Sequence, residues 1–461
     1  MQKSVLFFSL LLFFTANSFG SQDSENLFNG QNLDGWEVLN GSATFEARDE
    51  MIVGISETKT PNTFLATKED FTNFVLEYEM KMDEGLNSGV QIRSKSQDSY
   101  NNGRVHGTQV ECEDTKRAWA GGIYDEARMG WRYPLDYNPD AKSAFKKGEW
   151  NTFKVVAFDN HIMTWVNGVP TANLVERKTE TGFVALQVHG IGNNKDMEGK
   201  EIKWKNLTIR DLSEEDFEQY RDMEAPQVSY LKNQLTEREK ENGWELLWDG
   251  KTTDGWRGAS LDHFPEKGWS INDGILKVHD AGGGEAAHGG DIVTEKKYEN
   301  FIFEVDFSLT KGANSGIKYF VNTELKQGEG SSIGCEFQIL DDEHHPDAKQ
   351  GVEGNRTLGS LYDLITANGL EFNPHLPTKK YVNGYDHFNR ARIVVDGKKV
   401  KHYLNGIKIV EYTRDTQMWR ALVAYSKYNE WENFGEQKTG HLLLQDHGNE
   451  VEFKNIKLKE L

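Results

Sequence analysis

The chain has 461 residues, with 53 Lys and Arg against 73 Asp and Glu and a formal net charge of −20 at pH 7. One hydrophobic core seldom extends over so long a chain, so we expect two domains of roughly 200 residues each. The acidic balance argues against nucleic acid and anionic membrane surfaces as partners, because both carry negative charge themselves.

The first twenty residues have the pattern of a secretory signal peptide. Lys3 carries the only charge, residues 5–14 are mostly apolar, and the small residues Ser18 and Gly20 precede a cleavage site before Ser21. The apolar run is too short to span a bilayer, so we expect no membrane anchor. The mature chain should start near Ser21, carry 52 basic and 73 acidic residues, and be periplasmic or secreted.

An internal repeat organises the rest of the chain. Ordered motifs of the first half return in the second half at offsets that grow from 220 to 258 residues. They include Leu27-Phe28-Asn29-Gly30 with Leu247-Trp248-Asp249-Gly250, Asn87-Ser88-Gly89 with Asn314-Ser315-Gly316, Asn167-Gly168 with Asn405-Gly406, and Gln187-Val188-His189-Gly190 with Gln445-Asp446-His447-Gly448. The kept order indicates a tandem duplication, with domains over residues 26–211 and 243–461.

Each copy has the pattern of short antiparallel strands. Residues 74–80 and 301–307 alternate apolar and polar side chains, which predicts half-buried strands. The Asn-Gly pairs favour the φ > 0 turns of β-hairpins. We therefore predict an all-β fold of two antiparallel β-sandwiches. Residues 212–242 differ, being rich in Glu, Lys, Arg and Gln, and we expect a linker of two short helices interrupted by Pro226.

Redox and cofactor chemistry finds little support in the sequence. Cys112 and Cys335 lie one in each half, which is no disulfide framework and is more typical of buried thiols. Residues 282–284 form a Gly-Gly-Gly run that precedes no predicted helix, so they do not predict a dinucleotide-binding loop. We expect no cofactor.

Polar residues gather at two places in the second copy. On the strand 335–341, Glu336 and Gln338 share one face and Asp341 ends the strand. The loop Asp342-Glu343-His344-His345-Pro346-Asp347 follows, then Arg356 and Tyr362, and the last strand ends in Gln445-Asp446-His447-Gly448. Carboxylates and imidazoles at 341–347 suit a divalent ion, but an ordinary acidic loop has the same spacing, so we assign no metal ligands and leave a metal as an alternative.

The first copy carries a related set. Gln109 and Glu111 alternate on the strand 107–113, Tyr124 follows, and Gln187 and His189 lie at the end of the final strand. Alternating Glu and Gln is common on a solvated sheet face, and a His at a strand end is commonly structural. A functional site is favoured because both copies place the Gln and the His equivalently, beside a strand of acids.

Together these motifs resemble the 3-keto-disaccharide hydrolase (3-keto-glycoside lyase/hydrolase) domain family, whose fold is a concanavalin-A-like jelly-roll sandwich. The resemblance covers nearly all of both copies and excludes the signal peptide and the linker. The second copy is closer to the family pattern. The first has Gln109-Val110-Glu111 where the second has Glu336-Phe337-Gln338, and it lacks the His-His-Pro-Asp loop. We therefore do not expect the two copies to share one substrate.

The resemblance implies cleavage of a 3-oxidised glycoside by base-assisted elimination and hydration. A ketone at C3 acidifies the hydrogen on C2, so the site needs a base, a donor to the enolate and an acid near the leaving oxygen. Histidine ordinarily titrates near neutrality, which makes His447 the candidate base. The other candidate catalytic residues are Arg356 or Tyr362 for the enolate, Glu336 or Asp341 as acid or orienting group, and His189 and Glu111 in the first copy. The candidate substrate-binding residues are Gln338, Gln445, Asp446, Gln109, Gln187 and Tyr124.

Two other functions fit the same residues. Sandwiches of this kind also host carbohydrate binding without catalysis, so a tandem binding module is an alternative. Glu336 and Asp341 could also act as the paired carboxylates of a conventional glycosidase. The oxidation that forms the ketone would belong to a separate enzyme.

Overall fold

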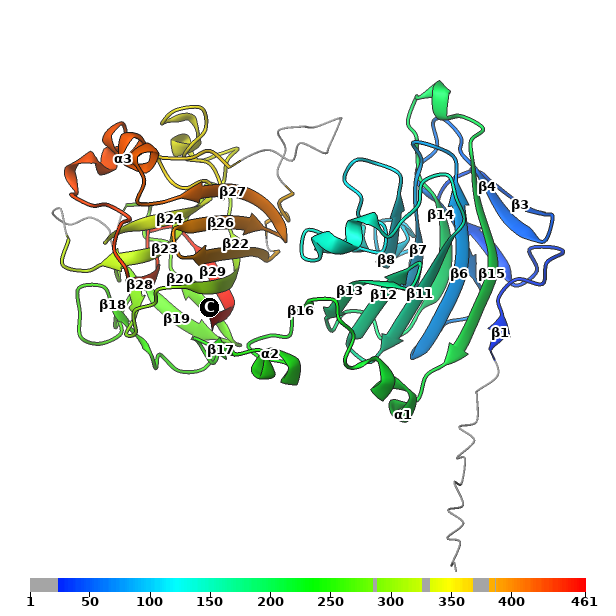
Figure 1. The fold of residues 1–461 in the computed structure, drawn as a ribbon, viewed down its shortest axis with the longest axis horizontal. Coiled ribbons are helices and arrows are strands. Elements are labelled where there is room, and N and C mark those ends of the chain that lie inside the picture. The colour runs from blue at the N-terminus through cyan, green and yellow to red at the C-terminus, as the bar shows by residue number, and fades with distance from the viewer. Residues whose placement is uncertain (1–23, 285–287, 326–331, 368–380, 386) are drawn as a thin grey trace, which may run out of the picture.

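The computed structural model describes residues 24–284, 288–325, 332–367, 381–385 and 387–461. Within these ranges the chain forms two β-sandwiches that lie side by side and are joined by a segment with short helices (Figure 1). The predicted all-β architecture of two antiparallel sandwiches is therefore confirmed. The predicted signal peptide, residues 1–20, lies outside the described residues.

The first sandwich consists of a nine-stranded and a seven-stranded sheet. The larger sheet contains β1 (Glu25–Asn26), β3 (Thr44–Arg48), β4 (Met51–Ile55), β6 (Phe74–Met82), β11 (Asn151–Phe158), β12 (His161–Val166), β13 (Val169–Val175), β15 (Glu201–Asp211) and β16 (Gln227–Ser229). The smaller sheet contains β2 (Trp36–Leu39), β5 (Thr63–Thr67), β7 (Asn87–Lys95), β8 (His106–Glu113), β9 (Ile123–Glu126), β10 (Gly130–Tyr133) and β14 (Phe183–Val188). Their orders are β16-β13-β12-β11-β6-β15-β4-β3, with β1 beside β15, and β10-β9-β8-β7-β14-β5-β2.

The second sandwich has an eight-stranded and a five-stranded sheet. The larger contains β17 (Trp244–Leu246), β19 (Trp269–Asn272), β20 (Ile275–Val278), β22 (Phe301–Leu309), β25 (Asn389–Asp396), β26 (Lys399–Leu404), β27 (Ile407–Thr413) and β29 (Val451–Glu460). The smaller contains β18 (Trp256–Gly258), β21 (Ile292–Thr294), β23 (Asn314–Asn322), β24 (Ile333–Leu340) and β28 (His441–Leu444). The orders β19-β20-β29-β22-β25-β26-β27, with β17 beside β29, and β18-β21-β28-β23-β24 repeat those of the first sandwich. The sequence repeat is thus a repeat of strand topology.

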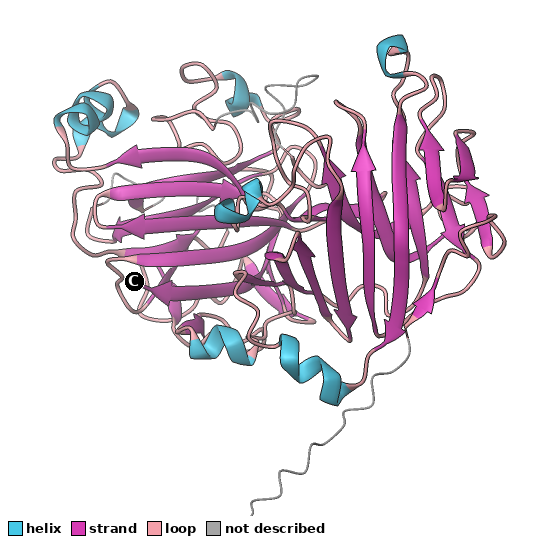
Figure 2. Cartoon of the chain, turned by 45° about the vertical axis from the view of Figure 1, so that its right-hand side comes forward, coloured by secondary structure: helices cyan, strands magenta, loops and turns pink. Residues whose placement is uncertain are grey.

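Helices are short and lie outside the sheets (Figure 2). They are α1 (Glu214–Phe217), α2 (Glu237–Glu241) and α3 (Gln417–Ala424), with 3₁₀ turns η1 (Pro139–Ser143), η2 (Lys195–Met197), η3 (Glu218–Tyr220), η4 (Pro346–Lys349) and η5 (Lys427–Glu430). Among the described residues, none of the helices has the combined length and apolar character needed to cross a membrane. The segment between the domains holds α1 and α2 as predicted, and also β16, a parallel partner of β13 that was not predicted.

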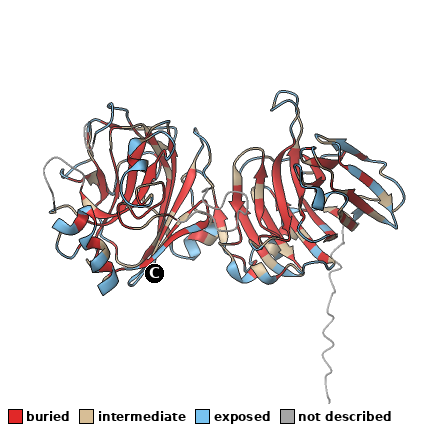
Figure 3. Cartoon of the chain, turned by 90° about the horizontal axis from the view of Figure 1, so that it is seen from above, coloured by how far each residue is buried: buried red, intermediate tan, exposed pale blue. Residues whose placement is uncertain are grey.

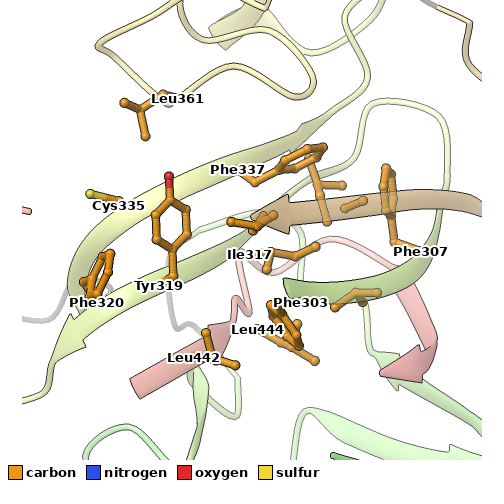
Figure 4. Close-up of a cluster of buried hydrophobic side chains, with 14 of the residues drawn as sticks. Phe303, Phe307, Ile317, Tyr319, Phe320, Cys335, Phe337, Leu361, Leu442 and Leu444 are labelled. Carbon is orange, nitrogen blue, oxygen red and sulfur yellow. The ribbon is translucent and has the colours of Figure 1, made fainter. Parts of the chain in front are cut away.

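The cores lie between the two sheets of each sandwich, where the strands are buried and the loops and helices exposed (Figure 3). In the second domain, Phe303 and Phe307 of β22 pack with Phe337 of β24 and Leu444 of β28 (Figure 4). These inward side chains alternate along their strands with residues of the opposite face, which is the period that the sequence displays. Cys112 and Cys335 are both buried and free.

Two arginines and a tyrosine join the domains. The ring of Tyr230, just after β16, lies between the guanidinium groups of Arg132 and Arg390, at 3.6 and 4.0 Å from ring centre to Cζ. Arg390 also donates to the backbone oxygen of Ser229 (2.9 Å) and forms two hydrogen bonds to Asp306 (2.6 and 3.0 Å). Two cations beside a partly buried aromatic ring make a directional contact. The linker therefore ties the two domains together and does not merely connect them.

Candidate functional site

The repeated Asn-Ser-Gly motif begins β7 in the first domain and β23 in the second. In the second domain, the Ser315 hydroxyl donates to the backbone oxygen of Gln445 (2.9 Å), which ties β23 to β28. At Gly316, an added Cβ would lie 2.2 Å from Oε1 of Glu336, so the absence of a side chain makes room for this carboxylate. The motif therefore leaves the space that the polar side chains of the neighbouring strand occupy.

Glutamate and glutamine have exchanged places between the two copies. Strand register aligns Glu336 with Gln109, and Gln338 with Glu111. The facing pairs are Lys318↔Glu336 and Gly316↔Gln338 in the second domain, and Gln91↔Gln109 and Gly89↔Glu111 in the first. Nζ of Lys318 lies 3.6 Å from Glu336, whereas Gln91 donates a neutral hydrogen bond to Gln109 (2.7 Å). Each copy thus keeps one buried carboxylate here, at different positions.

A row of polar side chains connects Glu336 to His447 in the second domain. The Gln338 amide satisfies its neighbours when its NH₂ donates to Oε1 of Glu336 (3.1 Å) and its oxygen faces the Asn314 amide (3.2 Å). The Asn314 amide also lies 3.2 Å from Nε2 of His447. Two strands and the end of a third supply this row: β24, β23 and the residues after β28.

The row holds one edge of the His447 ring. The Asn314 amide nitrogen lies 3.2 Å from Nε2 of His447, so this ring nitrogen is engaged by β23. Nδ1 of His447 is buried and has no hydrogen-bond partner among the residues that the structure describes. His447 thus has one ring nitrogen held by Asn314 and one that the described residues leave without a partner.

Asp341 is held by several donors at the end of β24. Its carboxylate accepts from the backbone N–H of Gly312 (2.7 Å) and the hydroxyl of Tyr385 (2.8 Å), and Nδ1 of His344 lies 2.9 Å away. Burial would raise the pKa of Asp341, but these hydrogen bonds lower it below its ordinary value. A carboxylate that stays ionised suits the orienting role better than the acid role.

Arg356 and Tyr362 converge on Asp347. Arg356 donates to Asp347 (3.0 Å) and to Asp363 (2.7 Å), and the Tyr362 hydroxyl donates to Asp347 (2.8 Å). Burial raises the pKa of Tyr362, and Glu336 and Asp347 add to the effect, so the phenol stays protonated. The ring of His345, which caps η4, lies 6.3 Å from that of His447 and brings this loop to the end of β28.

Gln445 and Asp446 are placed differently from the histidine that follows them. Both carboxylate oxygens of Asp446 accept from backbone N–H groups, those of Gly289, Gly290 and Gly448, each at 2.9 Å. Asp446 is fully buried and anchors loops. Gln445 is also buried, and its backbone contributes to the sheet through Gly316 and Ser315. Neither side chain is exposed at a surface where a substrate could replace its contacts.

The first domain has its own buried polar cluster around Glu111. This carboxylate accepts from Gln109 (3.0 Å) and Asn87 (3.1 Å), and Arg117 lies 3.2 Å away. Gln187 donates to Gln109 (2.8 Å), so these five polar residues form one network. Burial raises the pKa of Glu111 to about 7, even though Arg117 opposes this. A carboxyl that titrates near neutrality can both donate and accept a proton.

Glu111 faces a cavity of about 360 Å³ that His189 and Tyr124 also line. Burial lowers the pKa of His189, and its Nδ1 lies 3.0 Å from the backbone oxygen of Gly190, which leaves Nε2 as the basic atom of a neutral ring. Burial raises the pKa of Tyr124 to about 12. A larger hollow of about 870 Å³ lies over β6 and β11, and none of the predicted site residues lines it.

The described residues contain no group of three or more His, Cys, Asp or Glu side chains arranged to hold a metal ion. At the loop 341–347, His344 pairs with Asp341, His345 accepts from the backbone of Asp347, and Asp347 binds Arg356. The side chains that suggested a metal from their spacing are thus engaged with one another and with Arg356.

Several residues of the site could not be recognised from the sequence. Asn314 stands out in the sequence only as part of a repeat, and Arg117 and Tyr385 do not stand out at all, because they lie in loops that no repeat marks. The Asn of the Asn-Ser-Gly motif was the available signal, because a repeated Asn that begins a strand has a polar side chain to satisfy.

Comparisons with known proteins agree with this architecture. The family model of the 3-keto-alpha-glucoside-1,2-lyase-like domain matches residues 23–210 and 243–459. A 3-keto-disaccharide hydrolase of Bacteroides thetaiotaomicron is 35% identical over 240 residues, which are 48% of this chain and 79% of that protein.

Solved structures also match. A candidate glycosyl hydrolase from Parabacteroides distasonis is 29% identical, with a TM-score of 0.42 over 50% of this chain and 100% of that one. The carbohydrate-binding module CBM66 from Bacillus subtilis is 13% identical, with a TM-score of 0.27 over 38% of this chain and 95% of that one. Since the family model covers most of the chain in two separate regions, the chain belongs to the family of 3-keto-alpha-glucoside-1,2-lyase-like domains and carries that domain twice.

Proposed function

We propose that this protein cleaves the glycosidic bond of 3-keto-glycosides by base-assisted elimination followed by hydration. Its family and the name of its relative, a 3-keto-disaccharide hydrolase, support the substrate class. The structural observation that carries the mechanism is His447, whose Nδ1 is buried without a partner among the described residues while Asn314 holds Nε2.

The reaction needs two steps. In the first, the base removes the proton from C2, the electrons form the C1–C2 double bond of an enone, and the C1–O bond breaks as the leaving oxygen takes up a proton. In the second, water adds across this bond, with hydroxyl on C1 and a proton on C2. The products are a 3-keto sugar and the free alcohol. The sum is hydrolysis and is redox-neutral, so it consumes no oxidant, and the ketone must be made by a separate oxidising enzyme.

The described residues supply the parts that such a reaction requires. In this proposal His447 accepts the C2 proton and passes it to the leaving oxygen, and Arg356, which has more N–H groups than Asp347 and Asp363 engage, is the donor to the developing enolate. Arg356 holds Asp347, which in turn holds Tyr362. Glu336 orients His447 through Gln338 and Asn314, as the third residue of a catalytic triad orients the base.

Replacing His447 with Gln tests the base. We expect turnover of a 3-keto-disaccharide to fall about 10²-fold or more, the scale for losing a general base. The melting temperature should change little, because His447 is only half-buried and outside the core. His263→Gln is the matched control, since this histidine is exposed and contacts Asp262. Full activity of His447→Gln would place the base elsewhere.

Running the reaction in D₂O separates elimination from direct hydrolysis. Elimination and hydration incorporate one solvent deuterium at C2 of the product, which mass spectrometry and NMR detect. Cleavage of the unoxidised parent disaccharide without deuterium at C2 would instead indicate a conventional two-carboxylate glycosidase. Binding of both sugars with cleavage of neither would indicate a binding module.

A further inference from the structure

One residue in the wall of the first-domain cavity comes from the second domain. The cavity of about 360 Å³ is lined by Glu111, Arg117, Tyr124, Trp131 and His189, and also by Tyr381. The Tyr381 side chain packs against the hydrophobic core of the first domain, although it lies 170 residues beyond the end of β15 in sequence. A site with a wall from each domain exists only when both are docked.

A repeated Asn-Gly turn holds Tyr381 in this position. In the turn between β26 and β27, the Asn405 side chain donates to the backbone oxygen of Tyr381 (2.9 Å). The next residue, Gly406, presses on the first domain, since an added Cβ would lie 2.4 Å from the Tyr137 ring. Ile407 is buried in the core of the first domain. Three consecutive residues thus fix both the domain contact and the backbone that carries Tyr381.

The equivalent turn of the first domain has no such function. Asn167 donates to the backbone oxygen of Ala144 (2.9 Å), as Asn405 does to Tyr381. At Gly168, however, an added Cβ would meet nothing within 4 Å. The turn therefore contributes to the contact between the domains only in the second copy, and the two domains are not equivalent.

The cavity wall has the chemistry that a sugar ring requires. Tyr124 and Trp131 both line the cavity and are in contact edge to face (5.2 Å between ring centres). Arg117 lies over the Trp131 ring, so the partly buried Tyr124 ring is the one that can meet the C–H face of a pyranose. Arg117 and Glu111 supply a charged donor and a carboxyl for its hydroxyls. A volume of about 360 Å³ is at the lower end of ligand pockets, which range from roughly 300 to 1,000 Å³, and suits one or two sugar rings.

We propose that the first-domain cavity is a hexose-binding site built from both domains, in which Tyr381 is a specificity-determining residue. The substrate class, a glycoside in its 3-keto or unoxidised form, rests on the proposed function. The composite wall does not. Tyr381 lines the same cavity as the Glu111 carboxyl and so selects which sugars fit, while the second domain retains its own site at His447.

Calorimetric titration of the full chain with a 3-keto-disaccharide and with its unoxidised parent tests this inference. His447→Gln is used throughout so that the keto sugar is not consumed. We expect Glu111→Gln and Tyr381→Ala each to weaken the same binding event at least tenfold. Tyr381→Phe should restore most of the affinity because the ring is kept. Tyr425→Ala, at a tyrosine that is 93% exposed, should change nothing.

The outcomes separate this inference from the proposed function. If Glu111→Gln abolishes an event that Tyr381→Ala leaves intact, or if no event depends on either residue, the composite site is wrong. If Tyr381→Phe is as weak as Tyr381→Ala, the ring is not what the sugar contacts and the inference also fails. If Tyr381 governs binding but no variant or wild-type protein cleaves either sugar, the composite site stands and the proposed reaction fails.

Discussion

At the scale of single residues, burial decides which acids of the two sites can exchange protons. Glu111 and Asp341 are both buried carboxyls near strand ends, yet their pKa values move in opposite directions. Asp341 accepts hydrogen bonds from backbone N–H groups and a tyrosine, which stabilise its charge. Glu111 has amide donors and shares the cation Arg117 with Glu113, so desolvation dominates. The sequence displays both simply as acids.

The raised pKa of Glu111 should be visible in stability. Unfolded Glu111 ionises near 4.5 and folded Glu111 near 7, so the stability it contributes below about pH 4.5 is lost as the pH rises to about 7. Glu111→Gln cannot ionise and escapes this loss. Between pH 4.5 and pH 8, the unfolding free energy of Glu111→Gln minus that of the wild type should therefore increase, by at most about 3 kcal/mol.

Urea denaturation at several pH values measures this difference. Glu37→Gln, at an exposed glutamate of β2, is the control and should track the wild type. A constant difference between Glu111→Gln and wild type across the range would mean that Glu111 is already ionised at pH 5.

At the scale of elements, the Asn-Ser-Gly motif that begins β7 and β23 has a structural reason for its presence in both copies. The Ser ties neighbouring strands, the Asn orients a site residue, and the Gly leaves space for the polar side chain of the next strand. A strand interior ordinarily loses stability from glycine, so its presence marks a close approach. The strand is thus built around the site.

Filling that space should damage the second-domain site. Gly316→Ala places a Cβ 2.2 Å from Oε1 and 2.9 Å from Cδ of Glu336, so the carboxylate must move away from Gln338. We expect about 1–3 kcal/mol of destabilisation from overpacking and a loss of turnover. Gly384→Ala is the control, because an added Cβ there meets nothing within 4 Å and the backbone φ is not positive. Unchanged melting temperature and activity in Gly316→Ala would show that Glu336 moves freely.

At the scale of the whole molecule, the two sandwiches have the same strand order but contribute different residues to the contact between them. Tyr230 lies between Arg132 and Arg390, and Arg390 is itself neutralised by Asp306 within the second domain. The turn at Gly406 adds a second contact on the first domain. Two separate contacts fix an orientation, where one would leave a hinge.

The duplicated Asn-Gly turns allow this contact to be tested with a matched pair. Gly168 and Gly406 both have positive φ, of 77° and 82°, so alanine at either should cost about 1 kcal/mol in its own domain. Only Gly406→Ala should also separate the domains, because its Cβ would meet Tyr137. We expect a larger radius of gyration by small-angle X-ray scattering for Gly406→Ala alone. Equal radii for both variants would contradict a role of this turn in docking.

The sequence by itself determined the repeat, the all-β architecture and the family, because strand alternation, turn residues and ordered motifs are local or depend only on order. It also led to His447, Glu336, Gln338, Glu111 and His189, because both copies present them at equivalent places. Whether a polar residue faces a cavity or anchors a loop was decided only by the tertiary structure. Asp446 and His447 are adjacent in sequence, yet one is saturated by backbone N–H groups and the other presents an unpartnered nitrogen. Tyr381 reaches the first-domain cavity only because the two domains dock, and burial and docking depend on contacts between residues far apart in the chain.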